Sequence, residues 1–227
     1  MGIRVVPGEI AARDATTRTI LPTTVQAKWP PFERVAETIA TPRRRFPAHH
    51  HAEVEVLTYI IEGNGSYEYE KEPGRPVDEG SVQLLAAPST ASHVINPGKG
   101  QTVRWFAVVA TLPKGSTASP RVQFGHAPDS GALPDSTIVH SLVGPGTPVQ
   151  SSLGLECSVI GFVAPGTAFR RIGRANLGVC YALSGQGEVD NAPLEGGEAA
   201  LVEDSAGIAI RGEPGFRLVV VQAPRPP

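Results

Sequence analysis

The chain has 227 residues, enough for one large β domain or for two domains of about 110 residues that each bury a core. Its formal net charge of −2 lacks the basic excess that nucleic acids or anionic membranes normally require of a partner, so we expect neither. The 25 glycines and 22 prolines favour short strands and tight turns, and the sequence predicts an all-β protein. No run of eighteen apolar residues and no secretory segment is evident, so a cytoplasmic location is expected.

The first 34 residues predict only edge strands or arms, from short apolar pieces at 3–6 and 20–25. Three adjacent arginines at 43–45 follow; a solvated loop is the simpler interpretation, and attraction of an anionic substrate is the alternative. His126 and His140, in loops rich in Gly, Pro and Asp, are expected to be surface or satisfied core residues.

Three consecutive histidines open residues 46–65, FPAHHHAEVEVLTYIIEGNG, whose later part has the β-branched, aromatic and aliphatic composition of a strand. Successive strand side chains point to opposite faces, so His49 and His51 share one face and His50 points to the other. Two imidazoles on one face can converge on a transition metal. Glu55 has the same parity and could be an oxygen ligand or a general base, although parity alone would also allow Glu53.

A second segment brings a third histidine. The apolar run at 82–87 meets Pro88 and a small polar stretch, which predicts a strand, a turn and a new strand that carries His93. A hairpin of this length can return His93 to His49 and His51. The sequence therefore predicts a metal site formed by His49, His51, Glu55 and His93. Residues 63–65, Gly-Asn-Gly, predict a hairpin turn between the histidine strand and the alternating stretch at 66–70.

The pattern HxHxxxE, then Gly, then Pro, a turn and His93 with Asn96 three residues on, resembles the two-part motif of the cupin superfamily. HHHAEVEVLTYIIEG, preceded by Phe46 and Pro47, looks most like the pirin family, whose stretch reads HPH, then ETVTY or EILTY and an acidic-Gly turn. The close resemblance covers about residues 35–112. It implies a bicupin, two tandem cupin-type antiparallel β-barrels, with the ion in the N-terminal one.

The resemblance also implies a cofactor and an activity. Some pirin-like proteins oxidise flavonols such as quercetin with dioxygen, and some act as nuclear transcription cofactors. The family's second motif usually ends in HSE, whose glutamate is the fourth ligand, whereas Ile95 stands at that position here. Three imidazoles leave coordination positions open, as non-haem iron chemistry requires, so one divalent ion is expected, Fe(II) first, with Ni, Cu, Mn or Zn as alternatives.

The second half of the chain repeats the first. Residues 59–65, YIIEGNG, match 181–187, YALSGQG, and HVINPG from His93 matches IRGEPG from Ile210. We therefore predict an N-terminal barrel over residues 1–125 and a C-terminal barrel over 126–227. The residues aligned with the metal positions of the first barrel cannot hold the same ion; they are Arg171, Gly173, Leu177 and Ile210.

A structural role is expected for the C-terminal unit, with an anion site at Arg170, Arg171 and Arg174 as the alternative. Cys157 and Cys180 lie in apolar, strand-like surroundings without CxxC spacing and are expected to be buried free thiols.

The leading functional hypothesis is a metal-dependent dioxygenase of a flavonol-like or enol-containing small molecule. The alternative is a regulatory or interaction protein that binds metal without turnover and would have a protein partner. The third hypothesis is a cupin isomerase that uses the ion as a Lewis acid. Four apolar residues could form walls for an aromatic substrate, although we favour a role in the core; they are Leu57, Tyr59, Leu84 and Trp105.

Overall fold

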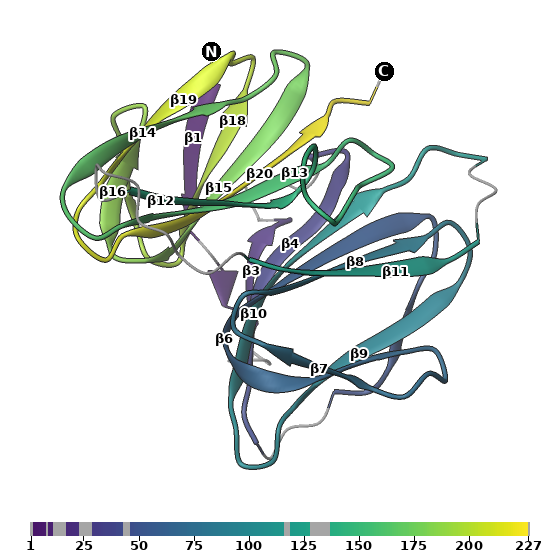
Figure 1. Cartoon of the computed structure of the whole chain (residues 1–227). Helices are drawn as coiled ribbons and strands as arrows, with labels where there is room; N and C mark the ends of the chain where they lie inside the picture. Colours follow the sequence, from purple (N-terminus) through teal and green to yellow (C-terminus); the bar gives the residue numbers. More distant parts are fainter. Residues whose placement is uncertain are drawn as a thin grey trace. The chain divides into compact units, whose positions relative to one another are not determined.

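Every regular element of the described chain is a β-strand, and the strands pair antiparallel (Figure 1). The structure is a computed structural model that describes residues 2–7, 9–10, 17–22, 29–42, 46–115, 119–127 and 137–226, so the three adjacent arginines at 43–45 lie outside it. The all-β prediction is confirmed. Within the described ranges, no helix is long and apolar enough to cross a membrane.

The chain divides into two compact units. The N-terminal unit comprises Glu9–Ala127 with Ser151–Leu153, and the C-terminal unit comprises Met1–Gly8, Pro128–Gln150 and Gly154–Pro227. The division at Ala127 lies two residues beyond the expected boundary. The assignment of the first residues also differs, because β1 (Gly2–Pro7) pairs with β18 (Glu198–Glu203) of the C-terminal unit.

The N-terminal unit is built around a sheet with the strand order β11-β8-β6-β10-β4-β3-β2. Two short strands, β5 and β7, and the seven-residue β9 lie off this path: β7 and β9 pair with β6, and β5 pairs with β9. The strands are β2 (Glu9–Ile10), β3 (Thr17–Leu21), β4 (Phe32–Ala40), β5 (His49–His51), β6 (Val54–Tyr69), β7 (Arg75–Asp78), β8 (Ser81–Ala87), β9 (Ala91–Pro97), β10 (Val103–Thr111) and β11 (Arg121–His126).

Strand β6 connects the two parts of this unit, because its sixteen residues change partners along their length. Its first part pairs with β8 and β10, and its second part pairs with β7 and β9. The change falls at Gly63, whose φ is +82° and where a Cβ atom would lie 1.9 Å from the carbonyl oxygen of Thr102. The turn expected at 63–65 is therefore a bend within one strand, and only glycine fits there.

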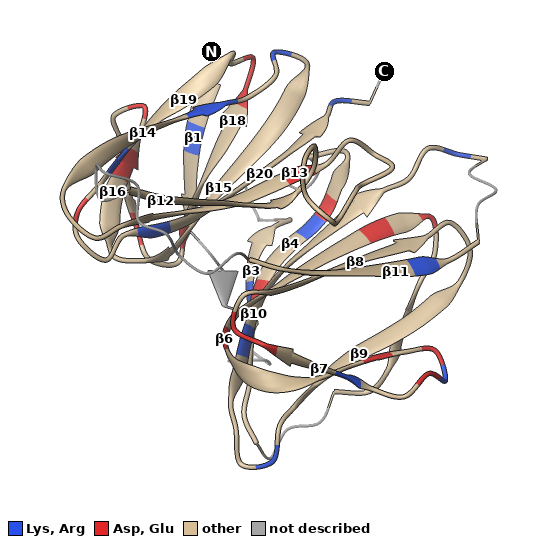
Figure 2. Ribbon diagram, in the orientation of Figure 1, with Lys and Arg blue, Asp and Glu red and all other residues tan. Residues whose placement is uncertain are grey.

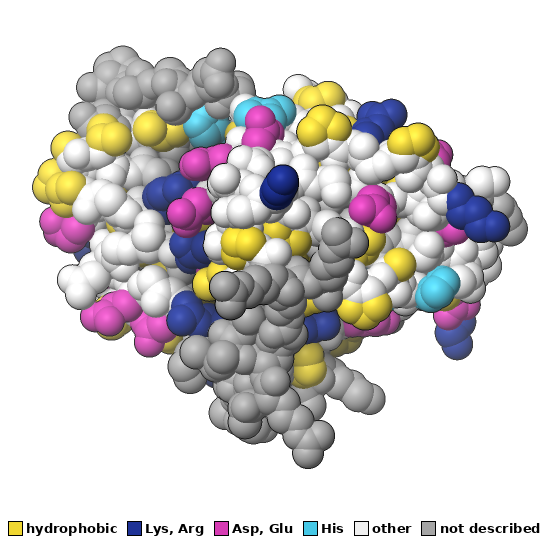
Figure 3. Space-filling view, turned by 90° about the horizontal axis from the view of Figure 1, so that it is seen from below, with side chains coloured by type: hydrophobic (Ala, Val, Ile, Leu, Met, Phe, Trp, Pro, Cys, Tyr) yellow, Lys and Arg dark blue, Asp and Glu magenta, His cyan; other side chains and the backbone are white. Residues whose placement is uncertain are grey.

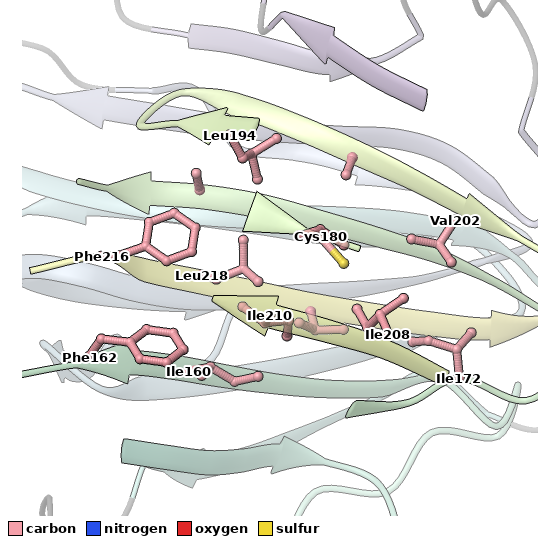
Figure 4. Packing of buried hydrophobic residues seen from close by; sticks show 14 residues of the cluster. Ile160, Phe162, Ile172, Cys180, Leu194, Val202, Ile208, Ile210, Phe216 and Leu218 are labelled. Atoms are coloured by element: carbon pink, nitrogen blue, oxygen red, sulfur yellow. The ribbon is translucent and has the colours of Figure 1, made fainter. Parts of the chain in front are cut away.

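The C-terminal unit contains a six-stranded sheet, β1-β18-β15-β20-β13-β12, and a four-stranded sheet, β14-β19-β16-β17. A buried apolar cluster that includes Ile160, Ile208, Ile210 and Phe216 occupies its interior (Figure 4). Cys180 belongs to this cluster, and Cys157 is also buried and free, as predicted. The remaining strands are β12 (Thr137–Val143), β13 (Glu156–Phe162), β14 (Gly166–Arg171), β15 (Asn176–Ser184), β16 (Gln186–Val189), β17 (Ala192–Glu195), β19 (Gly207–Gly212) and β20 (Arg217–Pro224).

Charged residues of both signs are distributed over the strands and loops of each unit (Figure 2). The face seen in Figure 3 shows basic, acidic and apolar side chains interspersed, with histidines among them. This mixture agrees with the small net charge of the sequence. The electrostatics of a site in this protein therefore depend on the individual charged groups around it.

Candidate metal centre

The antiparallel pairing of β5 with β9 brings three histidines together. His49 lies directly opposite His93, and His51 lies opposite Ala91. Side chains of directly opposed residues share a face, so His49, His51 and His93 converge while His50, opposite Ser92, points to the other face. The ring centroids are 4.6 Å apart for His49 and His93, 4.8 Å for His49 and His51, and 5.0 Å for His51 and His93.

The donor atoms of this histidine cluster fit a metal ion. One ring nitrogen from each residue lies within 4.8 Å of the others, so small ring rotations would bring all three onto one ion. Nε2 of His51 and both ring nitrogens of His93 are buried without a hydrogen-bond partner. Buried polar atoms without partners are uncommon and costly. A bound cation would supply the missing partner, and the group could therefore bind a metal.

The histidines are poised as neutral ligands. Burial, with a smaller contribution from His49, lowers the pKa of His51 to about 4, and burial followed by the other two rings lowers that of His93 to about 3. Burial also lowers the pKa of His49, whose ring hydrogen-bonds to the backbone of Pro47. A neutral imidazole held through one nitrogen presents the other to a metal. No proton has to be displaced from these rings at neutral pH.

A pocket of about 340 Å³ opens onto the cluster. Its floor includes Val56 of β6 and Val109 of β10, which pair directly and therefore point to the same face of the sheet. Trp105, packed edge-on against Phe46 with centroids 5.5 Å apart, supplies an aromatic wall. Ile95 is buried and lines the pocket on the same strand face as His93, so the position where the pirin pattern has a ligand points inward.

The structure does not bring Glu55 to this cluster. Glu55 neighbours Val56 on β6 and so points to the opposite face of the sheet, away from the pocket. Its buried carboxylate accepts hydrogen bonds from Oγ of Ser151 at 2.5 Å, and from Oγ and the backbone N–H of Ser152 at 2.5 and 2.8 Å. The carboxylate therefore holds the 151–153 segment within the N-terminal unit.

Strand alternation is interrupted at Glu53, between β5 and β6. Its φ of +60° interrupts the extended backbone, so alternation counted from His51 does not carry across to Glu55. Glu53 itself is exposed and outside the histidine cluster. Alternation within the sheet strands separates the residues expected to form walls for the substrate. Trp105 lines the pocket, whereas Leu57 and Leu84 lie opposite one another on the other sheet face and are fully buried.

Tyr59 is also buried and has the parity of Leu57, so it belongs to the core rather than to the pocket. The two histidines expected in loops lie on strands instead. His126 ends β11, exposed and 3.2 Å from a carboxylate oxygen of Asp78, and His140 lies within β12. Neither belongs to the histidine cluster.

The C-terminal unit has a matching strand pair without the ligands. Strand β14 pairs with β19 as β5 pairs with β9, but Ala168 stands opposite Ile210, which is fully buried in the apolar cluster. Arg171 is exposed, Gly173 precedes β15, and Leu177 is buried. Among the described side chains, the group able to share an ion is that of the N-terminal unit.

The arginines near β14 provide little support for an anion site. Arg170 lies 3.4 Å from the carboxylate of Glu156, so this guanidinium already has a counter-ion. The proposed anion site at Arg170, Arg171 and Arg174 stays a prediction from the sequence.

Two charged residues at the pocket were not singled out by the sequence reasoning. Glu33 and Arg34, both exposed on β4, line the pocket beside the histidines. They lie fifteen or more residues before His49, and only the pairing of β4 with β10 brings them here. That pairing shifts register between Val109, opposite Arg34, and Ala110, opposite Phe32, so strict alternation does not separate Glu33 from Arg34. No local motif marks them.

Comparison with known proteins agrees with this geometry. No family model matches the chain. A Pasteurella multocida (strain Pm70) protein named "putative quercetin 2,3-dioxygenase" is 29% identical over 92 residues, which span 40% of this chain and 39% of that protein. The match thus spans about two fifths of the relative's length.

Solved structures match over nearly the whole chain. A quercetin 2,3-dioxygenase from Acinetobacter baumannii has a TM-score of 0.83 at 16% identity, covering 98% of this chain and 79% of its own. Bacterial pirin YhhW from Escherichia coli, in complex with nickel(II), has a TM-score of 0.82 at 13% identity, covering 99% of this chain and 100% of its own. The chain therefore has a pirin-like bicupin fold, as the sequence resemblance predicted.

We expect substitution of His51 and of His50 to have opposite consequences for metal binding. His51→Ala removes a donor of the cluster and should weaken metal affinity by more than the ~10–100-fold that loss of an outer hydrogen-bond partner costs. His50→Ala removes an imidazole of the other strand face and should leave affinity nearly unchanged. Metal content after dialysis, measured by elemental analysis, checks both; equal losses would show that the site is misplaced.

Glu55 is expected to matter for stability and not for metal. Glu55→Gln exchanges a charged acceptor of three hydrogen bonds for a neutral amide and should lower the free energy of unfolding by about 2–3 kcal/mol. Glu53→Gln, at an exposed position, is the matched control and should cost less than about 0.5 kcal/mol. Denaturant titration measures stability. Loss of bound metal in Glu55→Gln would contradict this expectation and show that Glu55 is a metal ligand.

Proposed function

We propose that the protein is a metal-dependent dioxygenase acting on a flavonol-like or enol-containing small molecule. The observation that carries this proposal is the set of buried, partnerless nitrogens of His51 and His93 facing a pocket with an aromatic wall. The relatives named as quercetin dioxygenases support the substrate class, and the nickel-bound pirin supports a transition metal. Fe(II) remains our first expectation for the ion, because open positions on iron suit dioxygen chemistry.

The proposed roles divide between the two sides of the pocket. His49, His51 and His93 would hold the ion, which when bound supplies a Lewis acid and a redox centre for dioxygen. Trp105 and Val109 would orient an aromatic ring by packing against it, and Ile95, without a donor atom, leaves the adjacent position free for substrate. Closing an aromatic ligand against these walls would also exclude water.

Proton transfer needs a different carboxylate from the one first expected. Glu55 is held by two serines on the opposite sheet face, so it cannot act as the base in the pocket. Glu33 is the carboxylate that lines the pocket within the described chain, and we assign to it removal of a hydroxyl proton from the substrate. The hydroxyl of Thr111 donates to it at 2.9 Å and restricts its orientation.

A second candidate function is metal binding without turnover, for regulation or interaction. Ile95 favours this second function, because it stands where the pirin pattern has a carboxylate ligand. Among the described donors that could share the ion, the pocket provides three histidines and no carboxylate. A Lewis-acid isomerase would need the same ion and the same base but no dioxygen. Oxygen consumption therefore separates the leading function from both alternatives.

The dioxygenase assignment is tested with an oxygen electrode and a flavonol panel that includes quercetin. Protein loaded with iron, copper, nickel or manganese should consume dioxygen in proportion to substrate loss with at least one metal. His50→Ala should retain this activity and His51→Ala should lose it, which ties turnover to the cluster. Absence of consumption with every metal, in protein shown to contain it, would remove the dioxygenase and leave the alternatives.

Restoring a carboxylate at Ile95 should tighten metal binding. Ile95 points into the pocket beside His93, so Ile95→Glu can add an anionic oxygen, and affinity in a chelator competition should rise by about tenfold or more. Without metal, the buried charge has no partner and should cost a few kcal/mol or protonate. Ile95→Gln is the control of equal size without charge and should gain less. Unchanged affinity and melting temperature in Ile95→Glu would place this position outside the shell.

A further inference from the structure

Arg34 stands in a cross-strand row that forms the floor of the pocket. Strand pairing places Arg34 opposite Val109, Val109 opposite Val56, and Val56 opposite Leu85, so all four side chains leave the sheet on the same face. Both valines and Arg34 line the pocket that contains the histidine cluster. The sheet itself therefore directs a guanidinium toward the site.

This guanidinium is without a counter-ion in the described chain. No hydrogen bond or ion pair of Arg34 occurs there, although Arg18 and Arg104 of the same sheet both pair with Glu37. Its neighbour Glu33 lines the pocket too, but that carboxylate accepts a hydrogen bond from Thr111. An arginine is always charged and its planar fork suits a carboxylate or a similar pair of oxygens.

A cation at this place works against metal binding, because it adds positive charge beside the ion. The donor set of three neutral imidazoles does not offset a divalent ion, and Ile95 adds no carboxylate. With metal bound, the pocket carries an excess of positive charge. Among the described lining residues Glu33 reduces it, and a ligand with an anionic oxygen would balance it.

We propose that Arg34 is a specificity-determining residue that selects small aromatic substrates bearing an anionic oxygen, either a carboxylate or the enolate of a hydroxy-ketone. This inference rests on the proposed function, since it assigns a substrate class to the same pocket. The neutral face of the ligand packs on Trp105, and its anionic oxygens lie between Arg34 and the histidine cluster. A neutral isostere loses both charge interactions and binds weakly.

The test measures binding and needs no turnover. Calorimetry compares benzoate with benzamide and tropolone with tropone, on nickel-loaded and on metal-free protein, so the two pairs separate the carboxylate from the enolate as the source of the anionic oxygen. In the preferred pair, the anion should bind nickel-loaded protein at least tenfold more tightly than the neutral ligand. Arg34→Gln should weaken the anion about tenfold and leave the neutral ligand unchanged, and Arg34→Lys should recover part of the loss.

Arg121→Gln is the matched control, because it removes an exposed positive charge of the same unit that does not line the pocket. It should change anion affinity less than twofold. Equal weakening by Arg121→Gln and Arg34→Gln, or no preference for either anion over its neutral partner, would overturn the proposal. Failure of the metal site appears separately as absence of bound nickel, and failure of the dioxygenase appears as anion binding without oxygen uptake.

Discussion

The antiparallel register between β5 and β9 is the constraint on which the candidate site depends. It places His49 opposite His93, and the two-residue alternation of β5 then adds His51 to the same face. A slip of one residue would turn these imidazoles to the other face and bring His50 inward. The register is supported by β6, whose second part pairs with β9 and whose first part forms the pocket floor through Val56.

Local sequence predicted the parts of the site that local structure controls. The HxH spacing, the separate roles of His49 and His50, and the hairpin that returns His93 all follow from strand alternation and turn chemistry. The predicted role of Glu55 rests on alternation counted through Glu53, whose φ of +60° no residue type in that stretch signals, and the structure places Glu55 on the sheet face opposite the pocket. The turn predicted at Gly63 differs for a related reason. A glycine favours a turn, and the same conformational freedom permits a strand to bend and change its pairing partners.

Other parts depend on pairing between distant segments, which the sequence does not encode in any short pattern. Glu33 and Arg34 reach the pocket because β4 pairs with β10, whose Val109 also pairs with β6. Ser151 and Ser152 satisfy a carboxylate almost a hundred residues earlier in the chain. These contacts decide which acid is buried for stability and which faces the pocket. Hence the fold and the histidines could be predicted, whereas the charged surroundings of the cluster could not.

The two units show two solutions for the interior of the same type of fold. The C-terminal unit places Ile210 in a continuous apolar cluster, where burial of hydrocarbon stabilises the fold without polar atoms that need partners (Figure 4). The N-terminal unit instead buries His93 with both nitrogens unpaired, next to Ile95 on the same strand face. In the metal-free protein those nitrogens cost free energy that an apolar residue would not. A bound ion would offset that cost for at least one nitrogen of His93, so a metal ligand would account for a burial pattern that an apolar core does not require.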